Sequence, residues 1–364
     1  MTVAKRPDGK WRARVNTPEG QRSKHFARKA DALAWQADQK AALARGEFVD
    51  PARGKITFSE FYDEWSQRQI WETGTQRAMS LAVRSVPFGD VPLSRIRRSH
   101  VEGWVKAMTK TLAPGTVSTR FNNVGSVLRG AVRDQVIARN PAEGVKLPRQ
   151  RRREHALILP TPEQVQAVLD ASSDTFKPFV ALCAFAGLRL GEAAAVQAGD
   201  IDIEAKRLAV VRQVQRTNGR GVEIRHPKYG SERTIFLADQ LTTMLAEHVA
   251  AHVGPSDPRW LFKGQGDDPP HQNSIGYLWR AACKRAGVEG VKLHDLRHYY
   301  ASGLIAAGCD VVTVQKALGH ARATTTLNTY SHLWSTAEDR TRQAANDLMG
   351  AVHTGYASGR QSGE

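Results

Sequence analysis

The sequence predicts a multidomain α+β protein with a small N-terminal sheet and one helix, a helical bundle, and a mixed, mainly α domain holding a small antiparallel sheet. The chain of 364 residues is too long for one ordinary domain. Its hydrophobic content of 41% suffices for several cores. The spacing of apolar residues changes along the chain from a period of two to a helical period and back, which separates the three parts.

The net charge is +16 and the sequence pI is about 10.0. Such a charge indicates a polyanionic partner, with nucleic acid ahead of a membrane surface. Cys183, Cys283 and Cys309 lie far apart and form no C-x-x-C pair, so neither a zinc site nor a disulfide framework is expected. They are interpreted as buried thiols of a cytoplasmic protein, and no signal peptide or membrane span is expected.

Residues 1–46 are expected to form the sheet and its helix. Two Pro- and Gly-containing turns, at 7–9 and 17–20, bound segments in which apolar and basic residues alternate. The alternation predicts one apolar face, covered by a helix that ends near Gly46, and one cationic face. The cationic face is either solvated or inserted into a DNA groove, and the charge of the whole chain favours DNA.

Residues 47–55 are expected to be a linker, and residues 56–146 a helical domain. Thr57 and Glu60 form a predicted capping box, and Asn140-Pro141 ends the last helix. The aromatic stripe is interpreted as core rather than as a base-stacking platform. The basic side chains fit phosphate contact or a solvated face, and their number favours phosphate; they are Arg95, Arg97, Arg98, Lys106, Lys110, Arg120, Arg129 and Arg133.

Residues 147–158 are expected to be a flexible basic linker that contains Arg151, Arg152 and Arg153. The last domain is expected over 159–349, beginning with a helix capped by Thr161, and residues 350–364 are expected to be disordered. A buried helix over 176–188 leads into Arg189. Because an unpaired buried charge is costly, Arg189 needs a partner, either Glu192 or a substrate phosphate.

Residues 207–237 are predicted to form antiparallel strands. Asn218-Gly219 is a hairpin signal, and a second turn at 227–230 places Lys228 at or beside a hairpin tip. A lysine at such a tip is usually only solvated. Helices are expected at 238–253, 274–286, 310–318 and 336–349.

His294 and Arg297 are three residues apart and share one face of a predicted helix. An imidazole beside a guanidinium suits a phosphate, because Arg offers a planar fork of donors and His moves protons near neutral pH. A further imidazole follows at His320, and a phenol at Tyr330 in a Thr-rich run.

Together these segments resemble the tyrosine recombinase family, the λ-integrase type, and most closely the temperate phage integrases of high-G+C hosts. The matching motifs are G-L-R-x-G-E at 187–192, a lysine in the β segment, H-x-x-R at 294–297, L-G-H at 318–320, and Tyr330 followed by x-H. Each motif alone is weak, but their joint order and spacing are specific.

The resemblance implies a phosphotyrosine mechanism. Tyr330 would attack a phosphodiester to give a 3′-phosphotyrosine, with no metal, ATP or other cofactor. Arg189 and Arg297 would clamp the phosphate from two sides. Lys228 would be the general acid and His294 an acid or base. His320 would donate a hydrogen bond to the phosphate, and Glu192 would orient Arg189 or a neighbouring residue.

The resemblance also assigns the other domains. Residues 1–46 would be a three-stranded arm-type DNA-binding domain contacting DNA through Arg12, Arg14 and Lys24. Residues 56–146 would be the core-type DNA-binding domain, and the basic linker would close round the duplex. Integration and excision would be carried out by a tetramer on double-stranded DNA, with a host DNA-bending protein and an excision directionality factor as possible partners. The helix at 336–349 would dock on a neighbouring subunit, or pack in cis.

Rival interpretations remain. His294, His298 and His320 could be metal ligands, but Arg297 would repel the cation. A housekeeping chromosome-dimer resolvase, a transposon recombinase or a type IB topoisomerase would carry the same catalytic set, although the N-terminal sheet argues against the resolvase. A non-catalytic DNA-binding regulator is the alternative from another class, and the complete catalytic set argues against it.

Overall fold

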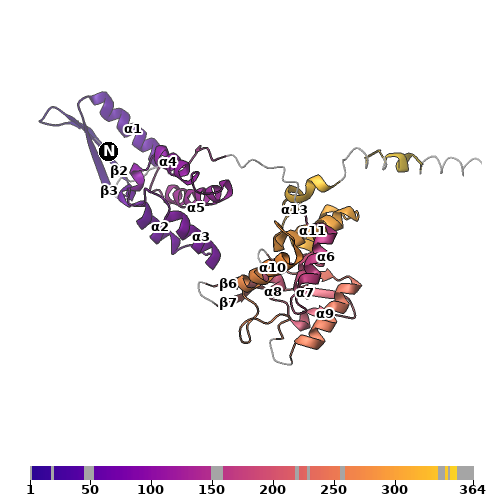
Figure 1. The fold of residues 1–364 in the computed structure, drawn as a ribbon. Helices are drawn as coiled ribbons and strands as arrows, with labels where there is room; N and C mark the ends of the chain where they lie inside the picture. Colours follow the sequence, from indigo (N-terminus) through magenta and orange to yellow (C-terminus); the bar gives the residue numbers. More distant parts are fainter. Residues whose placement is uncertain are drawn as a thin grey trace, which may run out of the picture. The chain divides into compact units, whose positions relative to one another are not determined.

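The structure, a computed structural model, describes residues 2–17, 20–44, 53–148, 159–217, 221–227, 230–254, 259–334, 341–342 and 345–350. The chain divides into two compact units, Met1–Arg153 and Glu154–Glu364. Figure 1 shows the N-terminal sheet and helices of the first unit and the mainly helical second unit. No described helix has the length and apolar character needed to cross a membrane.

The N-terminal sheet has three antiparallel strands in the order β1 (Val3–Lys5), β2 (Trp11–Thr17), β3 (Gly20–Phe26), covered by helix α1 (Lys29–Ala44). Ala13 and Val15 on β2 are fully buried under it. A side-chain amide from α1, that of Gln36, donates a hydrogen bond of 2.8 Å to the carbonyl of Arg14 and so fastens helix to sheet. The predicted sheet and helix are confirmed.

The register of β3 corrects the predicted cationic face. Lys24 pairs with Ala13, and paired residues of antiparallel strands project to the same side. Lys24 therefore lies on the helix-covered side, at its exposed margin, with its ammonium 5.4 Å from the ring centre of Phe26. Arg12 and Arg14 project to the opposite, open side, as expected.

The helical domain contains α2 (Phe58–Ser66), α3 (Thr73–Val83), α4 (Arg98–Met108) and α5 (Pro114–Arg133). Its aromatic residues form the core, as predicted, with edge contacts from Phe88 to Phe58 at 5.5 Å and to Trp104 at 6.1 Å between ring centres. The capping box of Thr57 and Glu60 that starts α2 is confirmed.

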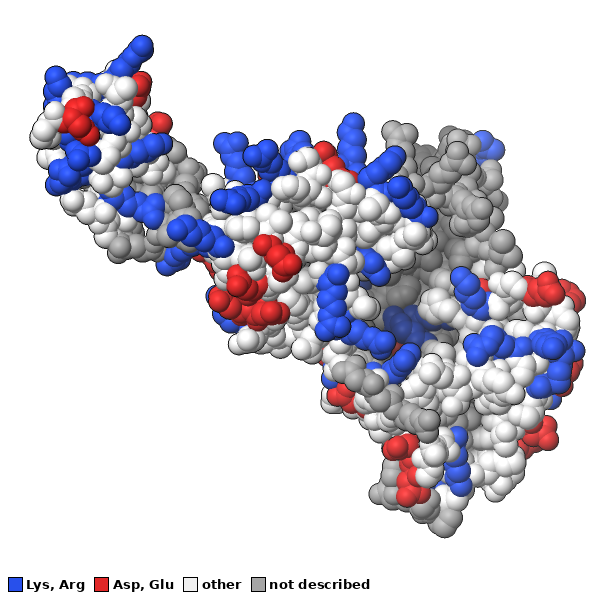
Figure 2. All heavy atoms as spheres, turned by 60° about the vertical axis from the view of Figure 1, so that its left-hand side comes forward, with Lys and Arg blue, Asp and Glu red and all other residues white. Residues whose placement is uncertain are grey.

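The cationic residues expected on the helical domain are at its surface. Arg97 and Arg129 are exposed and Arg120 is half-buried. Figure 2 shows Lys and Arg side chains spread over the face that this view presents. The expected basic linker, with Arg151, Arg152 and Arg153, lies outside the described residues.

The second unit is built around the apolar helix α7 (Lys177–Phe185), whose residues from Pro178 to Ala184 are buried. Helices α6 (Pro162–Ala171), α9 (Asp239–His252) and α11 (Leu293–Ala306) pack against it, and α10 (Gln272–Ala286) packs against α6. Figure 1 shows this cluster in the magenta to orange part of the chain. The predicted buried helix is thus confirmed, ending three residues before 188.

Two small antiparallel sheets complete this unit. One has the order β4 (Ile201–Asp202), β5 (Arg207–Val210), β8 (Arg233–Phe236), and the other pairs β6 (Gln213–Arg216) with β7 (Val222–Arg225). In the first sheet Leu208 pairs with Ile235, and both are buried in the main core.

The pairing of these strands differs from the hairpin that the turn predicted at 227–230 implies. Strand β8 pairs with β5 because Leu208 and Ile235 bury together there, and β7 pairs with β6. Strands β7 and β8 therefore belong to two different sheets. Lys228, predicted at or beside a hairpin tip, lies outside the described residues.

The last elements are α8 (Leu190–Ala194), α12 (Val311–Leu318) and α13 (Ala323–Tyr330), followed by the short helical turn Ser331–Leu333. The described residues 341–342 and 345–350 are helical and exposed, in agreement with part of the helix predicted at 336–349. Leu348 and Met349 are 71% and 62% exposed.

Close packing in the helical domain gives a first prediction. A Cβ at Gly130 of α5 would lie 2.5 Å from Nε1 of Trp65, whereas a Cβ at Gly103 of α4 would meet nothing within 4 Å. We expect Gly130→Ala to lower the free energy of unfolding of the domain by about 1–3 kcal/mol through overpacking. We expect Gly103→Ala to raise it by about 0.5–1 kcal/mol, because alanine restricts the unfolded chain. Urea denaturation of both variants measures the difference, and shifts of the same sign would contradict the packing.

Candidate active site

The site begins where α7 ends. Gly187 takes a left-handed conformation, φ +64°, and a Cβ there would collide with the ring of Tyr300. The chain then turns at Arg189, the N-cap of α8, whose backbone NH donates to Oε2 of Glu192 at 3.0 Å. The side chain of Arg189 donates from Nη1 to Oε1 of the same carboxylate at 2.6 Å. Glu192 thus holds Arg189 by both backbone and side chain, and is one of the two partners that the sequence suggested for Arg189.

A second guanidinium reaches the same carboxylate from strand β8. Arg233 donates from Nη2 to Oε2 of Glu192 at 2.9 Å and from Nη1 to Oε1 at 3.3 Å. The Arg233 side chain is 6% exposed and that of Glu192 is 1% exposed. Burial alone would raise the pKa of Glu192, but Arg233, then Arg189 and Arg297, outweigh it and lower the pKa to about 2. The carboxylate is therefore ionised at neutral pH.

The third guanidinium, that of Arg297, comes from α11 and is buried. It donates to the carbonyls of Gly187 and Leu318. Burial, and then the charge of Arg189, lowers the pKa of Arg297 to about 9, so the group stays charged at neutral pH. Arg297 thereby links the end of α7 to the end of α12.

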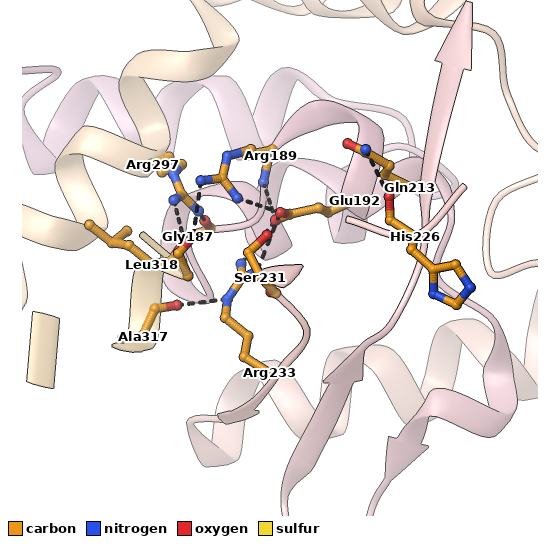
Figure 3. Close-up of polar contacts among 11 residues, drawn as sticks. Gly187, Arg189, Glu192, Gln213, His226, Ser231, Arg233, Arg297, Ala317 and Leu318 are labelled. Atoms are coloured by element: carbon orange, nitrogen blue, oxygen red, sulfur yellow. Dashed lines mark hydrogen bonds and ion pairs between the residues drawn. The ribbon is translucent and has the colours of Figure 1, made fainter. Parts of the chain in front are cut away.

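All three guanidinia meet the C-terminal end of α12. Arg233 donates to the carbonyl of Ala317 at 2.9 Å, Arg297 to that of Leu318, and Arg189 to that of Gly319 at 3.3 Å. Figure 3 shows the arginines converging between Glu192 and this helix end. Carbonyls at a helix C-terminus carry partial negative charge, which cations stabilise.

The arrangement leaves an excess of positive charge. Three guanidinium groups and one carboxylate, counted as +3 and −1, give a formal +2. Among the three, Arg189 is the most open, with 36% of its side chain exposed. A site of this kind binds an anionic group such as a phosphate, because guanidinium forks match its oxygens.

Gly319 and His320 follow directly. Gly319 caps α12 in a left-handed conformation, and His320 is held by hydrogen bonds in both directions with Gln315. The imidazole Nδ1 of His320 lies 2.9 Å from the hydroxyl of Thr326. Burial, and then the charges of Arg297 and Arg189, lower the pKa of His320 to about 4. The imidazole is therefore neutral at neutral pH.

Tyr330, the last residue of α13, is 1% exposed. Its hydroxyl lies 2.6 Å from Nδ1 of His298 on α11. Burial raises the pKa of Tyr330 to about 12, while the charges of Arg297 and Arg189 act in the opposite direction. The phenol therefore lies within electrostatic reach of both arginines.

The second unit thus contains six of the expected site residues: Arg189, Glu192, His294, Arg297, His320 and Tyr330. The arginines, Glu192 and His320 meet at the end of α12. His294 lies on α11 one turn before His298, its ring edge-on to that of His298 at 4.8 Å between centres. Burial, and then Arg297, lowers the pKa of His294.

The sequence interpretation missed two residues of this site. Arg233 falls only within the strands predicted over 207–237, and His298 is named only as a possible metal ligand. A signal existed for each: Arg233 precedes the buried Ile235 by two residues, and His298 follows Arg297 on the face of α11 that carries His294. Neither signal names a partner, because Glu192 and Tyr330 are distant in sequence.

The structure does not favour the metal interpretation. Within the described part of the chain, no three or more His, Cys, Asp or Glu side chains gather in a way that would hold a metal ion. His298 contacts the hydroxyl of Tyr330 and His320 contacts that of Thr326.

Comparison with known proteins agrees with this geometry. Residues 160–336 match the phage integrase family. The putative prophage phiRv2 integrase of Mycobacterium tuberculosis is 27% identical over 354 residues, which cover 93% of this chain and 92% of that protein. The ICEBs1 integrase of Bacillus subtilis is 24% identical over 270 residues, covering 71% and 72%.

Solved structures show the same fold. The integrase of transposon Tn1549 in complex with transposon right-end DNA has a TM-score of 0.70 at 20% identity, covering 81% of this chain and 100% of that one. A λ integrase tetramer bound to a Holliday junction has a TM-score of 0.59 at 14% identity, covering 92% and 94%.

The buried carboxylate gives a second prediction. Glu192→Gln replaces one carboxylate oxygen by an NH2 group, which donates hydrogen bonds. That group would face Arg189 and Arg233, whose guanidinium groups can only donate. We expect the free energy of unfolding to fall by about 3–5 kcal/mol, because two guanidinia lose their counter-charge. Urea denaturation measures this loss. The matched control is Glu247→Gln at an exposed position of α9, expected to change stability by less than about 0.5 kcal/mol. Similar values for the two variants would contradict the role of Glu192.

Proposed function

We propose that this chain, whose residues 160–336 belong to the phage integrase family, cleaves and rejoins DNA strands at specific sites through Tyr330. The observation that carries the proposal concerns the buried phenol of Tyr330. The charges of Arg189 and Arg297, two of the three arginines around Glu192, act on this phenol. Such a site combines a nucleophile with neutralisation of a phosphate.

In the proposed reaction, the phenolic oxygen attacks a phosphodiester and becomes linked to the 3′ phosphate, while the 5′ oxygen leaves. Arg189 and Arg297 neutralise the charge that develops on the non-bridging oxygens, and His320 donates a hydrogen bond to them. Lys228 protonates the leaving 5′ oxygen. The covalent link conserves the energy of the broken bond, so rejoining by the reverse reaction needs no ATP.

The biological reaction that we infer is integration and excision of a phage or another mobile element in a bacterial host, on its nucleoid. The curated relatives are named as prophage and element integrases. The λ integrase relative forms a tetramer on a Holliday junction, and we infer the same assembly here. A DNA-bending host protein and a directionality factor complete the proposed set of partners.

Covalent trapping tests the proposal. The protein is incubated in EDTA, without ATP, with a nicked duplex carrying the core site, and is compared with Tyr330→Phe on a denaturing gel. A shifted band that is absent for the variant is the expected result. If the wild-type protein binds the site tightly but forms no adduct, the chain is a non-catalytic DNA-binding protein.

A third prediction concerns the N-terminal sheet. Arg12 and Arg14 project from its open side, so we propose that this side contacts arm-type DNA. A protein that begins at Lys55 should bind core-type sites as before and lose binding to arm-type sites, in electrophoretic mobility-shift assays. Within the full chain, Arg12→Ala with Arg14→Ala should reproduce the loss more strongly than Lys24→Ala, because Lys24 lies on the helix-covered side. Equal binding of the truncated protein to both sites would contradict the assignment.

A fourth prediction concerns the C-terminal helix. Residues 345–350 are exposed, including the large apolar side chains of Leu348 and Met349. Burial of these side chains against another protein surface would be favourable. We propose that a neighbouring subunit provides this surface. Deletion of residues 335–364 should abolish tetramers on DNA, measured by analytical ultracentrifugation, and leave binding of one subunit to a core site intact. Unchanged assembly would show that the segment packs in cis.

A further inference from the structure

The hydroxyl of Tyr330 is held by His298, a residue outside the expected catalytic set. The distance from Oη to Nδ1 is 2.6 Å, a short hydrogen bond between a phenol and an imidazole. Their rings meet edge-on, with centres 5.6 Å apart. His298 is half-buried on α11, and the phenol enters from α13.

The other two histidines of the site contact residues other than Tyr330. His294 was expected to exchange protons with the reacting groups, but it contacts the ring of His298. His320 has its Nδ1 on the hydroxyl of Thr326. Among the described residues, His298 is therefore the imidazole in position to receive a proton from Tyr330.

The protonation states suit this direction of transfer. The charged and titratable groups around His298 are His294, Asp295 and Arg297 on α11, His320 after α12, and the phenol itself. Burial, and then His294, lower the pKa of His298 to about 4, with Asp295 opposing, so the imidazole is neutral near pH 7. In the tautomer that carries its proton on Nε2, Nδ1 accepts from the phenol. Burial raises the pKa of Tyr330 to about 12, so the phenol ionises only if a base takes its proton during attack.

We propose that His298 is the catalytic base of strand cleavage, an inference that rests on the proposed function. As Oη of Tyr330 bonds to phosphorus, its proton moves to Nδ1 of His298. The bond from phosphorus to the 5′ oxygen breaks, and that oxygen takes a proton from the general acid, the role proposed for Lys228. In rejoining, the 5′ hydroxyl attacks, the bond to the tyrosine breaks, and His298 returns its proton to the phenolate.

Two substitutions distinguish a catalytic base from a restraint, which is a residue that only holds the phenol in place. His298→Asn keeps an acceptor near the position of Nδ1, so it can hold the phenol but cannot take its proton. His298→Ala removes both. Single-turnover adduct formation is measured on a nicked suicide duplex, whose crossover sequence is first selected from a random duplex library by wild-type cleavage. Both variants should cleave about 10²–10⁴-fold more slowly, the usual contribution of a general base.

The pH profile provides a readout that a purely structural role would not change. Wild-type cleavage should vary little between about pH 6 and 9, because His298 is neutral throughout. In His298→Asn the phenol must lose its proton to solvent, so the rate should rise about tenfold per pH unit over this range. Profiles of the same shape for the two proteins would overturn the proposal.

The leaving group provides a second discrimination. In a substrate with sulfur at the 5′ bridging position, the departing thiolate needs no proton, since thiols are far more acidic than alcohols. Such a substrate should restore the rate of Lys228→Ala and leave His298→Asn slow. Rescue of His298→Asn would assign His298 to the leaving group and overturn its role as base for Tyr330.

Controls separate the remaining outcomes. His252→Asn, at an exposed position of α9, should cleave as wild type, and thermal melting should show that the His298 variants are folded. Near-normal cleavage by His298→Asn with slow cleavage by His298→Ala, or faster cleavage by either, would make His298 a restraint and overturn the proposal. If the wild-type protein forms no adduct on any duplex, the proposed function fails instead.

Discussion

The buried carboxylate of Glu192 is the group on which the rest of the site depends. It accepts one hydrogen bond from the backbone of Arg189, one from the side chain of Arg189 and two from the side chain of Arg233. The cost of its burial is therefore offset by two cations and four donors. Without it, two guanidinia would face each other with no counter-charge. Their positions fix those of the carbonyls that they bind at the end of α12.

That helix end positions the reactive groups. Arg233, Arg297 and Arg189 bind three successive carbonyls, from Ala317 to Gly319, and His320 is the next residue. Four segments remote in sequence, the turn after α7, strand β8, helix α11 and the end of α12, are therefore joined by charged hydrogen bonds. The formal charge that remains suits a phosphate, and Tyr330 lies where the arginine charges act on it.

Local signals in the sequence predicted much of this structure. The capping residues Thr57 and Thr161 and the buried helix before Arg189 are confirmed, because each depends on residues close together in sequence. Glu192, one of the two partners suggested for Arg189, is likewise within one turn of it. Strand register and sheet pairing depend on distant partners, so the side on which Lys24 lies and the pairing of β8 with β5 were predicted wrongly. Arg233 and His298 were missed for the same reason, since Glu192 and Tyr330 are their partners only in the folded chain.

A double-mutant cycle on Glu192 and Arg233 tests the central claim most directly. The free energies of unfolding of Glu192→Gln, Arg233→Met and the double variant are measured by urea denaturation and compared with that of the wild-type protein. If the carboxylate organises the arginines, the double variant loses much less stability than the sum of the single losses, with a coupling of about 2–3 kcal/mol. Losses that add to within about 0.5 kcal/mol would contradict it.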